Sequence, residues 1–81
     1  MSIQHSSIKN LFFQAINFEK KGNLLKAKSI YKKIIKINSK LPNVYYNLGN
    51  ILKDLGNYEK AINCYQKVIN IDSQNVSALN N

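Results

Sequence analysis

The sequence predicts an all-α fold made of antiparallel helix–turn–helix units, and three observations lead to that prediction. Apolar residues recur at intervals of three and four, which is the spacing of amphipathic helices. Short breaks that contain glycine or proline divide the 81 residues into segments of helical length. The pattern of residue types also returns when the chain is offset by 34 residues. We therefore expect about four helices plus a partial fifth in a single domain of residues 1–81.

Each break contains residues that end one helix and start the next. The pairs Gly22-Asn23 and Gly56-Asn57 combine a glycine, which suits the left-handed conformation after a helix end, with an asparagine, which suits an N-cap. Pro42 suits a first helical turn, where its missing N–H has no helical partner. The predicted helices run from Ser2 or Ser7 to Lys21, from Leu24 to Ile37, from Pro42 to about Leu55 and from Tyr58 to Ile71, followed by a turn at residues 72–75 and a fifth segment from Val76.

The repeat extends to the sizes of the side chains. Tyr31 corresponds to Tyr65, and the small residue Ala15 corresponds to Gly49. Small residues allow two helices to approach closely, and larger apolar residues fill the seam around them. A unit of this size cannot bury its own apolar surface alone and needs a copy of itself as neighbour. In the second unit we expect the seam to contain Tyr45, Leu48, Leu52, Leu55, Tyr58, Ile62, Tyr65, Val68 and Ile69.

A helix–turn–helix period of 34 residues resembles the tetratricopeptide repeat. The resemblance covers residues 8–41 as repeat one, 42–75 as repeat two and 76–81 as the start of a third. It implies a short solenoid of stacked repeats. Repeat one departs from the family pattern at Leu11 and Gln14. Repeat two matches the pattern at Tyr45, Leu48, Gly49, Ala61, Tyr65 and Val68.

The resemblance also implies a function, because the family generally holds a peptide segment or a partner helix in a concave groove lined by the first helix of each repeat. We therefore expect a protein–protein interaction module rather than an enzyme. Asn47 and Asn81 occupy matching positions, and an amide can pair with a ligand backbone. Phe12, Ile16 and Tyr46 should form an apolar patch beside the amides. The groove residues implied by the resemblance are Lys9, Phe12, Phe13, Ile16, Tyr46, Asn47, Asn50, Lys53 and Asn81.

The net charge of +8 is distributed unevenly along the chain. Residues 1–41 contain nine lysines and one acid, whereas residues 42–81 contain three of each. A basic helix face favours an anionic partner, such as nucleic acid, a membrane surface or an acidic protein; the alternative is a solvated face in a lysine-rich chain. Arginine, which best recognises phosphate and guanine, is absent, so we expect no specific nucleic acid. The basic face comprises Lys26, Lys28, Lys32, Lys33 and Lys36.

Catalytic and metal chemistry have few candidate residues. His5 and Cys64 are the single histidine and cysteine, and with four scattered acids they predict neither a metal site nor a Cys–His pair. We expect no cofactor. A single cysteine excludes an internal disulfide and fits a reducing compartment, so we expect a cytoplasmic protein. No apolar run approaches the ~20 residues of a membrane span, and the N-terminus lacks the basic and apolar regions of a secretory leader.

Two other interpretations stay open. One is that the repeats are the N-terminal part of a larger enzyme, such as a glycosyl- or sulfo-transferase, whose chemistry lies beyond Asn81. The other is a basic module that docks on anionic surfaces. We also expect a homo-oligomer, because the end of the repeat stack would leave apolar surface that a second copy can cover. That surface is drawn from Tyr58, Ile62, Tyr65 and Ile69.

Overall fold

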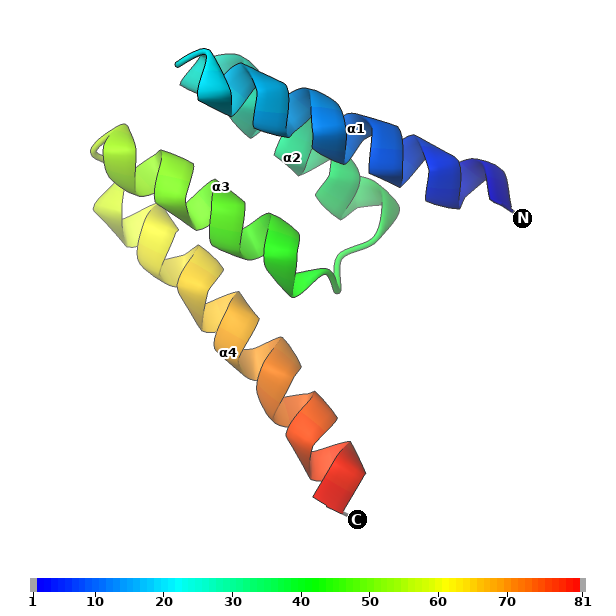
Figure 1. Cartoon of the computed structure of the whole chain (residues 1–81). Helices are drawn as coiled ribbons and strands as arrows, with labels where there is room; N and C mark the ends of the chain where they lie inside the picture. Colours follow the sequence, from blue (N-terminus) through cyan, green and yellow to red (C-terminus); the bar gives the residue numbers. More distant parts are fainter. Residues whose placement is uncertain (1, 81) are drawn as a thin grey trace. The chain divides into compact units, whose positions relative to one another are not determined.

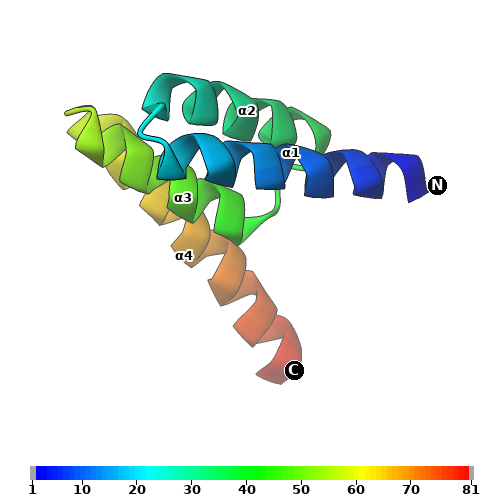
Figure 2. The same cartoon turned by 45° about the horizontal axis from the view of Figure 1, so that its top comes forward.

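The computed structural model describes the backbone of residues 2–80 and the side chains of residues 7–73. Over that range it contains four helices: α1 (Ser2–Lys20), α2 (Leu24–Ile37), α3 (Pro42–Asp54) and α4 (Tyr58–Asn80). The chain divides into two compact units, Met1–Ser39 (unit 1) and Lys40–Asn81 (unit 2). Within each unit the two helices lie side by side and antiparallel (Figures 1 and 2). The prediction of an all-α fold of helix–turn–helix repeats is confirmed.

Unit 1 joins α1 to α2 around Tyr31, whose side chain is fully buried. The Phe12 ring meets the Tyr31 ring edge-on, with 5.8 Å between ring centroids. The Tyr31 hydroxyl donates a hydrogen bond to the Glu19 carboxylate, so the buried polar group is satisfied. Ala15 is also fully buried, in keeping with its predicted role as the small residue of α1. The buried residues of α2 recur at helical spacing and are Ala27, Ile30, Tyr31 and Ile34.

Unit 2 contains the corresponding aromatic pair, Tyr46 and Tyr65, with 6.1 Å between ring centroids. Gly49 lies beneath the Tyr65 ring, and a Cβ added at Gly49 would come 2.8 Å from the Tyr65 Cε1. The ring can therefore lie against the α3 backbone only because this residue has no side chain. The Tyr65 hydroxyl donates a hydrogen bond to Oδ1 of Asn50. The buried residues of α3 are Val44, Tyr45, Leu48, Gly49, Ile51 and Leu52, and those of α4 are Ala61 and Cys64.

The two units make the same turn between their helices. Gly22 and Gly56 have φ angles of +81° and +85°, the left-handed region in which a side chain is strained. In each unit the asparagine that follows the glycine donates its N–H to the carbonyl five residues earlier, at 2.8 Å. This is the bond of a Schellman helix end. Asn23 also caps α2 by accepting a hydrogen bond from the Lys26 N–H. Both glycines thus act as predicted, and the predicted capping role of asparagine is confirmed at Asn23.

The prediction for the C-terminal part of α4 was wrong. A turn was expected at residues 72–75 and a fifth helical segment from Val76, but α4 continues without a break to Asn80. The reason lies in the absence of a breaking residue. Pro42 favours extended backbone at Leu41 (φ −106°, ψ 100°), whereas the equivalent position 76 is a valine and residues 72–75 contain neither glycine nor proline. A polar stretch alone does not end a helix that has no such residue.

The predicted seam of unit 2 was partly wrong as well. Four residues that the apolar pattern assigned to the seam are exposed: Leu55, Tyr58, Ile62 and Ile69. The exposure of the last three agrees with the expectation of open apolar surface on this helix. Val44 and Ile51, which the prediction omitted, are about 1% exposed and belong to the core. Their spacing from Leu48 is four and three residues, so the helical period does place all of them on one face.

Candidate functional site

The α1 face consists of Lys9, Phe12, Phe13 and Ile16, which the sequence analysis assigned to a ligand groove. These residues lie three and four apart, so they share one side of the helix. Lys9 is exposed, and Phe12 and Ile16 are half-buried. The Phe12 ring is held by its contact with Tyr31, while the neighbouring Phe13 is 56% exposed. Unit 1 thus presents apolar and aromatic surface on α1.

The α3 face consists of Tyr46, Asn47, Asn50 and Lys53. Tyr46 is 55% exposed, Lys53 is exposed, and the two asparagines are half-buried. The ring of Tyr46 rests on Tyr65 of α4, whose hydroxyl is bonded to Asn50. Because Oδ1 of Asn50 accepts that bond, its NH₂ group is the part that can donate to a ligand. Unit 2 therefore presents an aromatic ring beside an amide that is already fixed in orientation.

The support of the α3 face was not predicted. Tyr65 was assigned to the seam and Gly49 was read only as a point of close helix approach, yet together they set the positions of Tyr46 and Asn50. One signal was available in the sequence, because the offset that relates Tyr31 to Tyr65 also relates Phe12 to Tyr46. The predicted groove residue Asn81 lies outside the described residues. The α1 face belongs to unit 1 and the α3 face belongs to unit 2.

The basic face lies on the side of α2 opposite its buried residues. Lys32, Lys33 and Lys36 are exposed, and Lys28 is half-buried. Lys26 differs, because its ammonium lies 5.3 Å from the centroid of the Phe18 ring on α1, as in a cation–π contact. Four of the five predicted lysines, Lys26 included, are thus exposed to solvent.

A second apolar surface, the α4 stripe, comprises Tyr58, Ile62 and Ile69. These residues are 56–64% exposed and are spaced by four and seven residues, so they lie on one side of α4. Beside the stripe, α4 also carries the buried residues Ala61 and Cys64. α4 therefore has apolar residues both on its buried surface and on its solvent-exposed surface.

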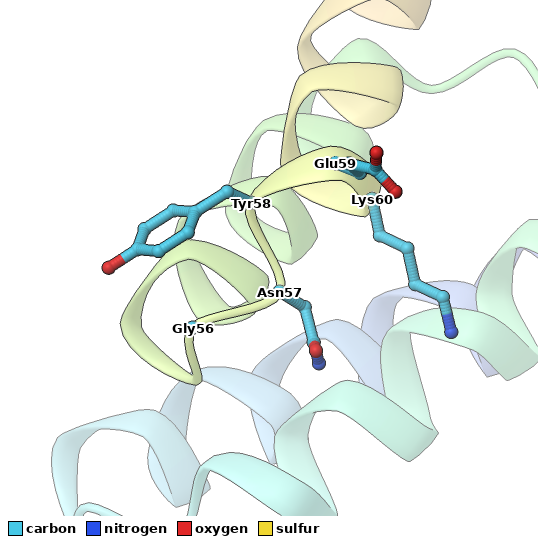
Figure 3. A pocket seen from close by; sticks show the side chains of 5 residues that line it. All are labelled: Gly56, Asn57, Tyr58, Glu59 and Lys60. Atoms are coloured by element: carbon cyan, nitrogen blue, oxygen red, sulfur yellow. The ribbon is translucent and has the colours of Figure 1, made fainter.

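A shallow hollow lies at the start of α4 and is lined by Gly56, Asn57, Tyr58, Glu59 and Lys60 (Figure 3). In this view the Asn57 and Lys60 side chains point to one side of the turn and the Tyr58 ring to the other. All the lining residues are exposed. A small-molecule site normally encloses most of its ligand, so the hollow is not a candidate site.

The titratable groups do not form a reactive cluster in the described part of the chain. Burial raises the pKa of Tyr45 above its ordinary value of 10.0, and the neighbouring Cys64 raises it further. Among the side chains of residues 7–73, no three His, Cys, Asp or Glu groups gather where they could hold a metal ion.

None of the described helices combines the length and apolar character that crossing a membrane requires.

Comparison with protein families gives two matches, and both are to the tetratricopeptide repeat. One covers residues 9–41, which contain most of α1 and all of α2. The other covers residues 42–75, which contain α3 and most of α4. The recognition of two repeats from the 34-residue period is confirmed, with matched ranges that differ from the predicted 8–41 and 42–75 by one residue. Comparison with curated proteins finds no significant match.

Proposed function

Because the chain belongs to the tetratricopeptide repeat family, we propose that it binds a peptide segment or a partner helix of another protein through α1 and α3. Tetratricopeptide repeats generally serve as protein–protein interaction modules and are typically non-catalytic. The α1 and α3 faces are the surfaces on which the first helix of each repeat presents aromatic groups to solvent. Exposed aromatic side chains of this kind are typical anchors of protein interfaces.

The observation that carries the proposal is the support of Tyr46. An exposed tyrosine normally loses rotamer freedom when it binds a ligand, and this loss opposes binding. Here the ring already rests on Tyr65, and the Tyr65 hydroxyl is tied to Asn50. The α3 face therefore offers an aromatic ring and an amide donor that are ordered before a ligand arrives. This combination suits an extended peptide, because the ring can cover an apolar side chain while the amide pairs with the peptide backbone.

Selection from a random peptide library tests the proposal. Peptides that bind the wild-type chain should bind Tyr46→Ser at least tenfold more weakly, because the substitution removes the anchor ring. Lys33→Gln on α2 serves as the matched control and should bind as the wild type does. Circular dichroism should show that both variants keep their helical content. Equal affinity of the wild type and Tyr46→Ser for every selected peptide would contradict binding at the α3 face.

A second candidate function, self-association, is favoured by the α4 stripe. Three large apolar side chains that are 56–64% exposed on one helix form a surface that another chain can cover. We propose that two copies pair through this stripe. Ile62→Lys should then lower the association constant at least tenfold in sedimentation equilibrium. Asn63→Lys, which adds the same charge at an exposed position of α4 outside the stripe, should change it little. A wild-type chain that stays monomeric at hundreds of micromolar would contradict pairing.

A binding role of this kind is also compatible with the repeats being part of a larger enzyme, such as a glycosyl- or sulfo-transferase. In that arrangement, the α1 and α3 faces would recognise the protein substrate and the chemistry would reside in another domain. The test by peptide selection is the same in both cases, because it measures recognition and not turnover.

A further inference from the structure

We propose that α2 docks unit 1 onto the surface of an anionic lipid bilayer, through a site that is separate from the α1 and α3 faces. The site is the lysine row, which consists of Leu25, Lys28, Lys32 and Lys36. These residues are spaced by three, four and four, so they form a line along one side of the helix. At a rise of ~1.5 Å per residue the line is about 16 Å long. A straight row of this length can lie flat on a surface.

The row is held rigidly because the other side of α2 is buried. Ala27, Tyr31 and Ile34 are each 0% exposed. Asn23 caps the start of the helix, and Asn38 closes its end with a backbone bond to Ile34. The helix therefore does not need the bilayer in order to fold, and its apolar core face is not available for insertion. Docking would place α2 on the surface with its axis parallel to the membrane, an orientation that requires no membrane-spanning helix.

The charge around the row is positive with little compensation. Residues 1–39 contain eight of the twelve lysines but only one of the four acids, Glu19. The carboxylate of Glu19 accepts a hydrogen bond from the buried Tyr31 hydroxyl, so it is directed to the interior of the unit. No other acid belongs to α2 or to the turns beside it. Lysines clustered on one face of a helix in this way are attracted to the negative surface potential of anionic lipids.

The exposed side chain of Leu25 favours an anionic bilayer over other polyanions as the ligand of the lysine row. Its side chain is 64% exposed, and it begins the row of lysines. A bilayer stabilises such a residue, because the leucine can enter the acyl boundary while the ammonium groups stay at the phosphates. Nucleic acid offers it no comparable apolar environment. The row also lacks arginine for bidentate phosphate contacts, and Tyr31, the one aromatic residue of α2, is buried and cannot stack on a base.

Vesicle co-sedimentation tests the proposal with the full chain. Vesicles of phosphatidylcholine alone should bind weakly, and vesicles with 30% phosphatidylserine should bind at least tenfold more of the chain at 100 mM salt. Raising the salt to 500 mM should remove most of that gain. Each lysine near the surface contributes about a fivefold factor, so Lys32→Gln with Lys36→Gln should reduce partitioning at least tenfold.

The matched control removes the same charge elsewhere. Lys60→Gln with Lys67→Gln lowers the net charge equally but alters two exposed lysines of α4, and it should reduce partitioning less than twofold. Leu25→Ser keeps every charge and should reduce partitioning about threefold or more, because it removes the apolar contact. Circular dichroism of all variants checks that the helices are intact. Equal losses of partitioning for the two double-lysine variants would mean that binding depends only on net charge. This result would overturn the proposal of a specific site on α2.

Two competitors distinguish the membrane from other anionic partners. A duplex of 24 base pairs and a poly-glutamate peptide are added at matched charge concentration to the vesicle assay. If the lysine row recognises lipid, neither should displace the chain from vesicles more than twofold. Displacement by the duplex would assign the row to nucleic acid, and displacement by the acidic peptide would assign it to an acidic protein. Either result would overturn the proposal.

Discussion

The two units contain corresponding aromatic pairs, but the small residue of the first helix differs, and the tyrosine hydroxyl of the second helix has a different partner in each. In unit 1 the small residue is Ala15, and the hydroxyl of Tyr31 bonds to Glu19. In unit 2 it is Gly49, and the hydroxyl of Tyr65 bonds to Asn50. The partner in unit 2 lies about one helical turn earlier on the first helix, once the 34-residue offset is applied. The missing methyl at Gly49 leaves room for the Tyr65 ring at that turn.

This difference changes what each unit offers to a ligand. Tyr31 is fully buried, so its hydrogen bond only stabilises unit 1. Tyr65 is half-buried, and its ring and hydroxyl support two residues of the α3 face, Tyr46 and Asn50. Both units thus contain the aromatic contact between their two helices, but only in unit 2 does this contact order an exposed surface that could bind a ligand. Charge separates the units in the same way, since unit 1 carries eight lysines and unit 2 four.

The largest difference in stability between the two units is expected when Tyr31 or Tyr65 is replaced by alanine. Tyr31→Ala should destabilise the chain by about 3–5 kcal/mol, because it empties a fully buried site and leaves Glu19 without its donor. Tyr65→Ala should cost about 1–3 kcal/mol, because the ring is already partly in water. Urea denaturation followed by circular dichroism measures both. Equal losses would mean that the two tyrosines have the same structural role.

Substituting the small residue of the first helix should destabilise both units, but for different physical reasons. Gly49→Ala should destabilise by about 1–3 kcal/mol, because the new methyl would lie 2.8 Å from the Tyr65 ring. Helix propensity alone predicts the opposite, a gain of about 1 kcal/mol. Ala15→Gly should cost about 1 kcal/mol for loss of propensity and of a buried methyl. If Gly49→Ala raises the midpoint of urea unfolding, the close approach of Tyr65 is not what selects glycine.

Substitutions at the two turn glycines should lower stability by similar amounts, whereas substitutions at the two tyrosines should not. Gly22→Ala and Gly56→Ala should each destabilise the chain by about 1–2 kcal/mol, because both positions have positive φ. The added Cβ would meet no neighbouring atom, so backbone strain is the whole cost at both positions. Asparagine tolerates this conformation better, so Gly22→Asn and Gly56→Asn should cost less than the alanine variants. Thermal unfolding of the four variants measures this. A difference above about 1 kcal/mol between the two alanine variants would show that the turns are not equivalent.

The smallest expected effect is an alkaline destabilisation that arises from Tyr45 in unit 2. The pKa of Tyr45 is raised by burial and then by Cys64, so the unfolded state loses its phenol proton at lower pH than the folded state. This contribution to stability is complete below the ordinary pKa of 10.0 and falls as the pH rises above it. Unit 1 has Leu11 at the corresponding position. Tyr45→Phe should make urea stability between pH 9 and 11 less dependent on pH, and an unchanged slope would contradict the assignment to Tyr45.

Most of the fold could be predicted because its signals are local. Helical spacing and the Gly-Asn pairs gave the bounds of α2 as observed, and the end of α3 within one residue. The continuation of α4 through residues 72–75 was missed because polar residues suggested a turn, although neither glycine nor proline is present there. Ile62 and Ile69 were assigned both to the seam and to the open end of the repeat stack, and their exposure agrees with the second assignment. Apolar spacing alone does not tell which of two apolar faces meets a neighbour.

The candidate site was less predictable, because it depends on contacts between helices. The sequence pattern placed Tyr46 and Asn50 on one side of α3, and the structure keeps them there. That Tyr65 lies between these two residues and orders both depends on the packing of α4 over Gly49. No rule of spacing along a single helix contains this information.

Amide chemical-shift mapping of a bound peptide tests the central claim most directly. A peptide selected against the wild-type chain is titrated into ¹⁵N-labelled protein, and the shifted amides are assigned to helices. Binding at the α3 face predicts the largest shifts at residues 46–53, with smaller shifts at residues 61–65, where Tyr65 supports the face. Shifts concentrated at the lysine row of α2 or at the α4 stripe, with residues 46–53 unchanged, would contradict the account.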